Sequence, residues 1–224
     1  MIPWVQLDTA TVPGGDTELR LMQRGHEFWI MTGTVALMTS RMSGSEEALA
    51  TLSAERIAGR KSPHMLIGGL GMGFTLRAAL GVVSADTKIT VAELAPAVVN
   101  WARGPLAPVF QGCLDDPRVT IETNDVGKLI AGSKAAYDAI LLDVDNGPEG
   151  LSRDSNERLY THAGLAAAKA ALKPGGVLAV WSSHPDAKFT RRLIDAGFRT
   201  EELKVRERAG NKGGRHVIWM ATRP

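Results

Sequence analysis

Short apolar runs alternate with amphipathic segments along most of the chain, which is the pattern of strands followed by helices. The segments between the runs predict helices at residues 45–59, 96–103, 126–132 and 157–172, and a further helix that follows the Gly-rich turn at 69–73 and ends at residue 80. Consecutive strands separated by helices need crossover connections, so we expect a parallel sheet with helices on both faces. The apolar runs that predict its strands are residues 65–68, 88–93, 119–123, 139–143 and 177–181.

The C-terminal part departs from this alternation. A helix is expected over residues 186–196, and it is followed by strands at 199–207 and 215–222. The Gly-rich residues 209–214 between these strands predict an antiparallel hairpin at the sheet edge. A doubly wound, mostly parallel sheet that ends in such a hairpin resembles the architecture of Rossmann-like methyltransferases, so we expect an α/β protein of that fold class.

The first part of the chain has yet another pattern, in which turn signals separate short segments of mixed polarity. These segments predict two β-hairpins, one pairing residues 4–10 with 17–23 and the other pairing 26–31 with 34–39. We therefore expect a small N-terminal β-hairpin domain over residues 1–42 and a Rossmann-like domain over residues 43–224. Ser45 is expected to cap the first helix of the second domain.

Composition limits the classes of partner. The 224 residues carry a formal net charge of only +2 without a long basic run, so neither nucleic acid nor a membrane surface is an expected partner. No apolar stretch approaches the ~18 residues that span a bilayer, and we expect a cytoplasmic protein. Cys113 is the single cysteine, which excludes a disulfide scaffold, and the histidines lack metal-ligand spacing, so no metal is expected.

A glycine-rich turn follows the first predicted strand of the parallel sheet. Gly69, Gly71 and Gly73 stand at alternate positions between that strand and a helix. Glycine is needed where a backbone turns tightly and approaches a ligand closely, although tight packing alone gives the same pattern. Met72 is placed so that its flexible thioether would pack on a ligand bound there. The turn predicts a nucleotide-type binding site.

Two acidic residues strengthen this prediction. Glu93 ends the next strand, where a carboxylate accepts hydrogen bonds from both hydroxyls of a ribose, and Asp125 follows the third strand, where it would read an adenine edge. Both positions are also explained by helix capping. No Lys and Ser/Thr phosphate cradle accompanies the turn, so S-adenosylmethionine is a better candidate than ATP.

A third group of polar residues follows the fourth strand. Asp143, Asp145 and Asn146 are expected at the mouth of the same crevice. An amine attacks a sulfonium-bound carbon only after it has lost a proton, and a carboxylate both holds the cationic amine and accepts that proton. Asp143 and Asp145 are therefore the candidate catalytic residues, although the same residues are typical of a turn.

The order of these motifs resembles the spermidine synthase family. The resemblance runs from the N-terminal hairpins through residues 67–73, 91–94, 137–143, 159–160 and 172–178. It implies aminopropyl transfer from decarboxylated S-adenosylmethionine to putrescine, and a homodimer. Carried over by position, Glu93 would bind ribose, Asp125 the adenine, Asp143 the reacting amine, and Tyr160 the substrate.

Two departures from the family pattern change the expected donor. The family's glycine-rich turn contains an Asp that neutralises the aminopropyl ammonium, and this chain has Gly71 there. The family's second catalytic Asp falls on or beside Asn146, which becomes a candidate substrate-binding residue. A buried ammonium without a counter-charge is costly, whereas the N–H groups of the turn suit the carboxylate of intact S-adenosylmethionine.

The leading hypothesis is therefore a spermidine synthase-like transferase that moves a methyl group from S-adenosylmethionine to a small amine. One alternative is a true aminopropyltransferase in which Asp145 supplies the missing carboxylate. A second is intramolecular attack or aminocarboxypropyl transfer from the same sulfonium. A third is a degenerate protein that binds adenosine compounds without turnover.

A few further residues are candidates on position alone. His184 follows the fifth strand at its carboxyl end and is a candidate for substrate binding, and His216 at the start of the last strand is a candidate proton acceptor, although a structural role explains either one. Trp181 is placed to line an acceptor pocket or the core. Glu46 and Glu47 are placed to face the acceptor, although an exposed first helical turn explains both.

Overall fold

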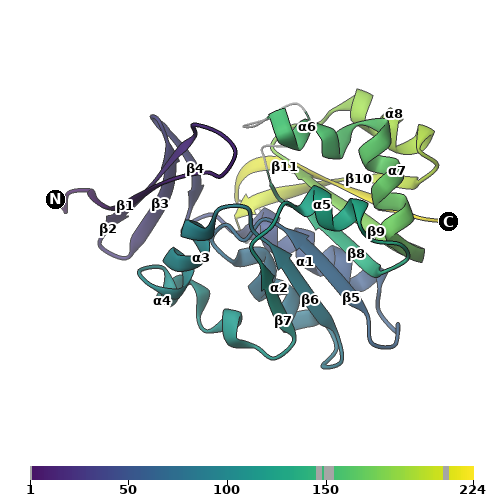
Figure 1. Ribbon diagram of the computed structural model, residues 1–224, viewed down its shortest axis with the longest axis horizontal. Coiled ribbons are helices and arrows are strands. Elements are labelled where there is room, and N and C mark those ends of the chain that lie inside the picture. Colours follow the sequence, from purple (N-terminus) through teal and green to yellow (C-terminus); the bar gives the residue numbers. More distant parts are fainter. Residues whose placement is uncertain (1, 145–147, 149–153, 209–211) are drawn as a thin grey trace.

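The computed structural model describes residues 2–144, 148, 154–208 and 212–224. The N-terminal residues form an antiparallel sheet of four strands, seen in purple at the left of Figure 1. Both predicted hairpins are present, and pairing between their inner strands joins them into one meander. The strands are β1 (Val5–Thr11), β2 (Glu18–Arg24), β3 (Glu27–Thr32) and β4 (Val35–Thr39).

The rest of the chain is built on a seven-stranded sheet of order β10-β11-β9-β8-β5-β6-β7. Strands β5 to β9 run parallel, and β11 pairs antiparallel with both β9 and β10. This confirms the expected fold class. The strands are β5 (His64–Gly68), β6 (Lys88–Ala92), β7 (Val119–Glu122), β8 (Tyr137–Leu142), β9 (Leu172–Ser182), β10 (Arg199–Arg208) and β11 (Lys212–Thr222).

Helices cover both faces of this sheet, as Figure 1 shows. One buried cluster joins one face to α1 (Gly44–Arg56), α2 (Phe74–Val82) and α3 (Pro96–Arg103). A second cluster joins the other face to α5 (Val126–Ala131), α6 (Asp154–Tyr160), α7 (His162–Ala171) and α8 (Ala187–Asp195). Strand β8 is buried at every position, because both of its faces lie under helices. None of the described helices is long and apolar enough to cross a membrane.

The predicted helix over residues 157–172 is two helices, and its continuity is a wrong prediction. Thr161 caps α7, where its hydroxyl accepts a hydrogen bond from the N–H of Gly164 (3.1 Å). A Cβ at Gly164 would overlap the carbonyl oxygen of Arg158, so glycine is required at this junction. Two short helices that the sequence pattern does not predict follow α3, namely α4 (Ala107–Phe110) and η1 (Cys113–Asp115).

The start of α1 differs from the prediction as well. Ser43, and not Ser45, occupies the N-cap position. Ser45 lies inside the first turn and is fully buried. Its hydroxyl is therefore available to side chains of the site described below.

The N-terminal sheet packs beside the carboxyl ends of the parallel strands. The indole Nε1 of Trp101 in α3 donates a hydrogen bond to Asp8 Oδ2 in β1 (2.6 Å). Strand β4 brings Leu37 and Met38 over the glycine-rich turn. The two sheets together therefore enclose the candidate site.

Candidate active site

The glycine-rich turn is shaped by close contact with the end of the neighbouring strand. Gly69 has a φ of +91°, and a Cβ there would lie 2.5 Å from the carbonyl oxygen of Asp143. The N–H of Asp143 in turn donates to the carbonyl oxygen of Gly68 (3.1 Å). Glycine at position 69 thus allows the turn and the Asp143 backbone to lie side by side.

The other two glycines of the turn lie close to different side chains. Gly71 has a φ of +52°, and a Cβ there would lie 3.0 Å from the sulfur of Met38. Gly73 has a φ of +77°, and its Cβ would lie 2.5 Å from the ring of Phe110. Gly71 lines both cavities described below, whereas Gly73 lines neither and packs against that ring.

Glu93 holds the turn in place. Its Oε2 accepts a hydrogen bond from the N–H of Leu70 (2.9 Å), and its Oε1 accepts one from the N–H of Ala95 (2.8 Å). Burial raises the pKa of Glu93 above its ordinary value, and the backbone N–H groups oppose this shift. The backbone N–H groups of Gly71 and Leu94 also act on this carboxylate, which therefore organises the turn from the wall of the adjacent cavity.

Glu93 and Asp125 line a cavity of about 130 Å³, which we call the Glu93 cavity. It lies at the carboxyl ends of β5, β6, β7 and β8, where open α/β sheets bind ligands. Asp125 also caps α5, because its Oδ1 accepts a hydrogen bond from the N–H of Gly127 (2.7 Å). Asp125 therefore both caps α5 and lines the cavity.

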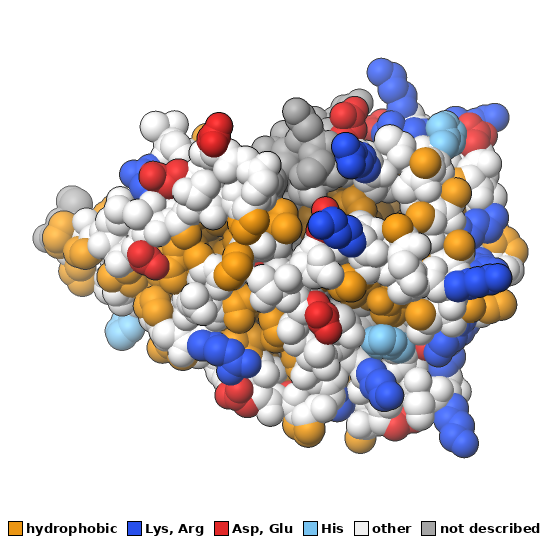
Figure 2. Space-filling model, in the orientation of Figure 1, with side chains coloured by type: hydrophobic (Ala, Val, Ile, Leu, Met, Phe, Trp, Pro, Cys, Tyr) orange, Lys and Arg blue, Asp and Glu red, His pale blue; other side chains and the backbone are white. Residues whose placement is uncertain are grey.

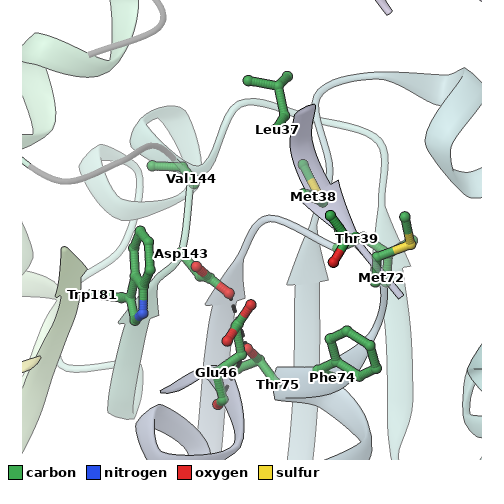
Figure 3. A pocket seen from close by; sticks show the side chains of 12 residues that line it. Leu37, Met38, Thr39, Glu46, Met72, Phe74, Thr75, Asp143, Val144 and Trp181 are labelled. Carbon is green, nitrogen blue, oxygen red and sulfur yellow. Dashed lines mark hydrogen bonds between the residues drawn. The ribbon is translucent and has the colours of Figure 1, made fainter. Parts of the chain in front are cut away.

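A second cavity, of about 110 Å³, adjoins the first, and we call it the Glu46 cavity. Leu37, Met38, Gly71, Asp143 and Val144 line both cavities. Figure 3 shows the carboxylates of Glu46 and Asp143 directed toward each other, with Trp181 on one side and β4 on the other. Met72, the predicted ligand contact, is almost fully buried in the wall of this cavity.

The two carboxylates of the Glu46 cavity are strongly perturbed. Burial, together with the charge of Asp143, raises the pKa of Glu46 to about 7, and the hydrogen bond from Ser45 opposes the shift. Burial also raises the pKa of Asp143 to about 6, while a hydrogen bond donated by Thr75 Oγ1 (3.1 Å) opposes the shift. A carboxyl group that titrates near neutral pH is suited to accept and release a proton.

Ser45 connects Glu46 to a histidine on the last strand. The Ser45 hydroxyl donates to Glu46 Oε2 (2.7 Å), and Ser45 Oγ lies 2.9 Å from Nδ1 of His216. The His216 ring also contacts the edge of Trp181, with ring centroids 4.8 Å apart. Nε1 of Trp181 is buried and has no hydrogen-bond partner among the described residues, so an acceptor atom of a ligand would satisfy it.

The remaining predicted residues lie elsewhere. Tyr160 is buried on the other face of the sheet, where its ring packs against Phe189. Nδ1 of His184 lies 2.9 Å from Ser183 Oγ, and neither Tyr160 nor His184 lines either cavity. Asp145 and Asn146 lie outside the described residues.

Glu46 and His216 were predicted as separate candidates, and Thr75 was not predicted. The pattern of α1 treats Glu46 and Glu47 as equivalent acidic residues of a first turn. The helix orientation separates them, because Glu46 lines the cavity and Glu47 is exposed. A polar residue at a buried position, as at Ser45, is the signal that could have identified the cluster.

The family model of the spermine/spermidine synthase domain matches residues 44–193. The chain belongs to this family. Its relatives include a polyamine aminopropyltransferase of Sulfolobus acidocaldarius, 30% identical over 54% of this chain and 39% of the relative. They also include putrescine N-methyltransferase 1 of Nicotiana tabacum, 36% identical over 51% of this chain and 28% of the relative. This chain thus spans well under half of the length of these two curated relatives.

Solved structures of the family share the fold. Spermidine synthase from Thermotoga maritima has a TM-score of 0.77 at 21% identity, with coverage of 98% of this chain and 73% of that protein. A spermidine synthase in complex with the transition state analogue AdoDATO has a TM-score of 0.76 at 20% identity, with coverage of 98% and 72%. The resemblance read from the sequence is therefore confirmed at the level of family and fold.

Proposed function

We propose that this protein transfers an alkyl group from the sulfonium of S-adenosylmethionine to a small amine, most simply as an N-methyltransferase. The observation that carries the proposal is that two adjoining cavities meet at Asp143. The donor would occupy the Glu93 cavity, and the amine would occupy the Glu46 cavity. Asp143 would then stand where the two reactants meet.

The residues of the Glu93 cavity fit an adenosine-type donor. Glu93 offers acceptor sites to ribose hydroxyls, Asp125 offers one to the adenine amino group, and Gly69 and Gly71 keep the backbone free of side chains. When bound, the sulfonium group supplies a carbon that is open to substitution by a nucleophile. The protein's part is to bind the donor and to hold the amine in line with that carbon.

The Glu46 cavity fits a small cationic amine. Asp143 and Glu46 would hold the ammonium group, and the apolar walls from Leu70, Met72 and Phe74 would exclude water from it. The Trp181 ring beside the carboxylates offers a face or an edge to the alkyl chain of the amine. Because the two carboxyls titrate near neutral pH, they can also take the proton that the amine must lose.

Methyl transfer from the intact donor is supported by the turn itself. Position 71 carries no carboxylate, so no side chain there would repel the carboxylate of S-adenosylmethionine or neutralise a lone ammonium. An aspartate at this position would also crowd Met38, whose sulfur lies 3.0 Å from a Cβ built there. The putrescine N-methyltransferase among the relatives supports this class of reaction.

Aminopropyl transfer is a second candidate, and Glu46 is the observation that favours it. Glu46 reaches the cavity from α1 and would supply the counter-charge that Gly71 lacks. The aminopropyltransferases among the relatives favour this reaction too. In that case the aminopropyl ammonium of decarboxylated S-adenosylmethionine would pair with Glu46, while Asp143 would receive the acceptor amine.

Calorimetric titration with S-adenosylmethionine and with its decarboxylated form distinguishes the two candidates. We expect tighter binding of the intact donor, and methylated 1,4-diaminobutane or another small amine as the product detected by mass spectrometry. Preference for the decarboxylated form and an aminopropylated product would establish the second candidate. Tight binding without product from any amine would identify a ligand-binding protein.

We further propose a homodimer formed through the N-terminal sheet. Val5 and Leu7 on β1 and Val35 on β4 are exposed on the two edge strands of this sheet. Figure 2 shows hydrophobic side chains gathered over this part of the molecule. Exposed edge strands that carry apolar side chains are able to pair with a second chain. Light scattering of the purified protein would give the mass of the assembly, and a monomer would refute the proposal.

A further inference from the structure

A line of hydrogen bonds leads from the Glu46 cavity toward the outside of the protein. Ser45 Oγ lies 2.7 Å from Glu46 Oε2 on one side and 2.9 Å from His216 Nδ1 on the other. We propose that Glu46, Ser45 and His216 form a proton exit path that carries the proton lost by the amine from the cavity to water. This inference rests on the proposed function, because it assigns a route to the proton that the transfer releases.

The balance of the reaction requires such a route. The amine binds as an ammonium ion, loses one proton, and uses the freed lone pair to form a bond to the donor carbon. The carbon–sulfur bond breaks, and its electron pair stays on the sulfur as a neutral thioether. The alkylated product is again an ammonium ion, so each turnover releases one proton from a cavity enclosed by protein.

The two ends of the path lie in different environments. Ser45 is fully buried, and Glu46 lines the cavity. The His216 ring is half-buried, and its Nε2 lies 3.8 Å from a Cβ built on Gly214, which is exposed. The ring therefore has Nδ1 toward Ser45 and Nε2 toward the surface. On one side the ring contacts that of Trp181.

Charged groups on neighbouring elements influence the pKa values at both ends of the path. Glu46 is faced by Asp143 from the end of β8 and has Glu47 as its neighbour on α1. His216 is faced by Glu207 from β10, which stabilises the imidazolium, and by His184 from the end of β9, which opposes it. Burial lowers the pKa of His216, while burial and the charge of Asp143 raise that of Glu46 to about 7, so Glu46 holds the proton more tightly than His216 and passage to the imidazole depends on loss of the Nε2 proton to water.

The single hydroxyl hydrogen of Ser45 couples the two ends. When Glu46 is ionised, Ser45 donates to its carboxylate, and His216 donates to Ser45 from Nδ1. When Glu46 holds the amine proton, it donates to Ser45, and Ser45 donates to Nδ1 of an imidazole protonated at Nε2. Transfer then places a proton on Nδ1 and releases the Nε2 proton to water. The imidazole then gains a proton from water at Nε2 and loses the Nδ1 proton to water as the half-buried ring turns, which restores the Nε2–H form for the next proton taken by Glu46.

This coupling makes the tautomer of His216 a direct readout. NMR of the ¹⁵N-histidine-labelled protein without ligands should show His216 changing from Nε2–H to Nδ1–H as Glu46 ionises near pH 7. Ser45→Ala should abolish this change. Ser53→Ala is the matched control, because Ser53 is equally buried on α1 but donates to the carbonyl oxygen of Leu49 and not to the site.

Kinetics supply the second readout. In Ser45→Ala we expect kcat for amine alkylation to fall about tenfold with KM nearly unchanged, because binding is retained while proton removal is slowed. A constant His216 tautomer in the unmodified protein, or an unchanged tautomer switch and kcat in Ser45→Ala, would overturn the exit path. A protein that shows the switch but alkylates no amine would retain the hydrogen-bonded path and refute the proposed function.

Discussion

Glu46 at the start of α1 and Asp143 after β8 direct their carboxylates into one cavity, with Thr75 donating a hydrogen bond to Asp143 Oδ2. Like charges in a partly buried site repel each other, and neither carboxylate has a cationic partner in the wall of the cavity as described. The folded protein therefore holds these groups at a cost that a bound ammonium ion would relieve. Such a cost is typical of binding sites.

The stability of the protein should consequently fall as Glu46 ionises. Its folded pKa of about 7 exceeds the ordinary value of 4.5, so the folded state binds more protons than the unfolded state between these values. The contribution of Glu46 to stability is therefore fully present below about pH 4.5, is lost as pH rises to about 7, and changes no further above it. Glu46→Gln should be about 2 kcal/mol more stable than the unmodified protein at pH 8, and equally stable at pH 4.

Urea unfolding at the two pH values measures this difference. Glu47→Gln provides the control, since Glu47 is the exposed neighbour on the same turn of α1 and should change stability by less than about 0.5 kcal/mol at either pH. Equal effects of the two substitutions at pH 8 would contradict the assignment of Glu46 to the cavity.

Gly69 should be irreplaceable for two separable reasons. Alanine would be strained at a φ of +91°, and its Cβ would lie 2.5 Å from the carbonyl oxygen of Asp143. Gly33→Ala tests the first reason alone, because Gly33 has a φ of +51° and no atom within 4 Å of its Cβ position. We expect Gly33→Ala to cost about 1 kcal/mol, and Gly69→Ala about 3 kcal/mol together with a loss of donor affinity.

Equilibrium unfolding and calorimetric titration of both variants check this prediction. If Gly69→Ala were no more destabilising than Gly33→Ala and retained donor affinity, the close approach of the turn to Asp143 would not matter for the site.

Gly73 should be required for packing and not for ligand contact. Its Cβ position lies 2.5 Å from the Phe110 ring, and Gly73 lines neither cavity. Gly73→Ala should therefore destabilise the protein by about 2 kcal/mol, and by at least about 1 kcal/mol less when Phe110→Leu has already removed the ring. A double-mutant cycle by urea unfolding measures this coupling, and additive effects would refute it.

The sequence predicted the parts of the site that depend on local pattern. Glu93 and Asp143 could be placed because each ends an apolar run, and parallel strands bring their carboxyl ends to one edge. The link from Glu46 through Ser45 to His216 joins α1 to β11, and its geometry depends on how the helix packs on the sheet. Periodicity carries no information about such a contact between distant segments.

The break between α6 and α7 was missed for a different reason. Thr161 and Gly164 are tolerated within a helix by propensity alone, so the pattern over residues 157–172 predicted one element. The close contact of Gly164 with the Arg158 carbonyl shows that the junction depends on local sterics that composition does not reveal.

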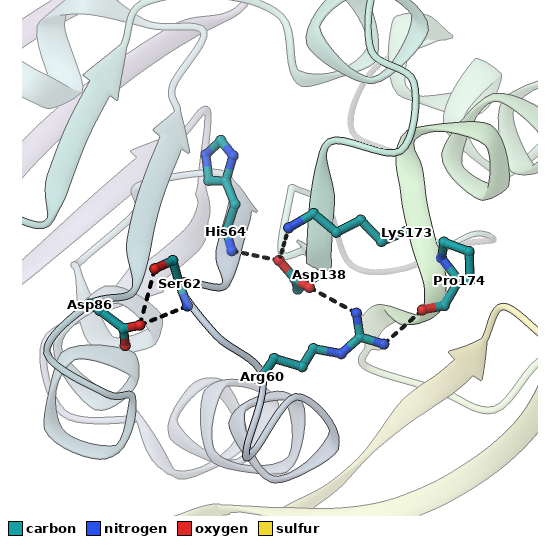
Figure 4. Close-up of polar contacts among 7 residues, drawn as sticks. All are labelled: Arg60, Ser62, His64, Asp86, Asp138, Lys173 and Pro174. Carbon is teal, nitrogen blue, oxygen red and sulfur yellow. Dashed lines mark hydrogen bonds and ion pairs between the residues drawn. The ribbon is translucent and has the colours of Figure 1, made fainter.

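Asp138 lies near the start of β8, at the other end of the strand from Asp143, and makes the polar contacts drawn in Figure 4. Its side chain is only 3% exposed and accepts hydrogen bonds from Arg60 Nη1 (2.8 Å), Lys173 Nζ (2.6 Å) and the N–H of His64 (2.7 Å). Burial alone would raise the pKa of Asp138, but these donors outweigh it and hold the pKa below the ordinary value of 3.8. The carboxylate thus joins β8 to the starts of β5 and β9.

Asp138→Asn should therefore cost about 2 to 3 kcal/mol at pH 7, because a neutral amide leaves two cations without their counter-charge. Since the pKa is lowered on folding, this contribution is fully present at neutral pH and is lost as pH falls below 3.8 through the folded value. Glu201→Gln is the control, because Glu201 pairs with Arg56 (2.8 Å) at the surface with 53% of its side chain exposed. That exposed pair should contribute less than about 1 kcal/mol to stability. Urea unfolding of both variants at pH 7 and pH 3 measures the two contributions. Equal losses of unfolding free energy in the two variants would contradict a role for the burial of Asp138.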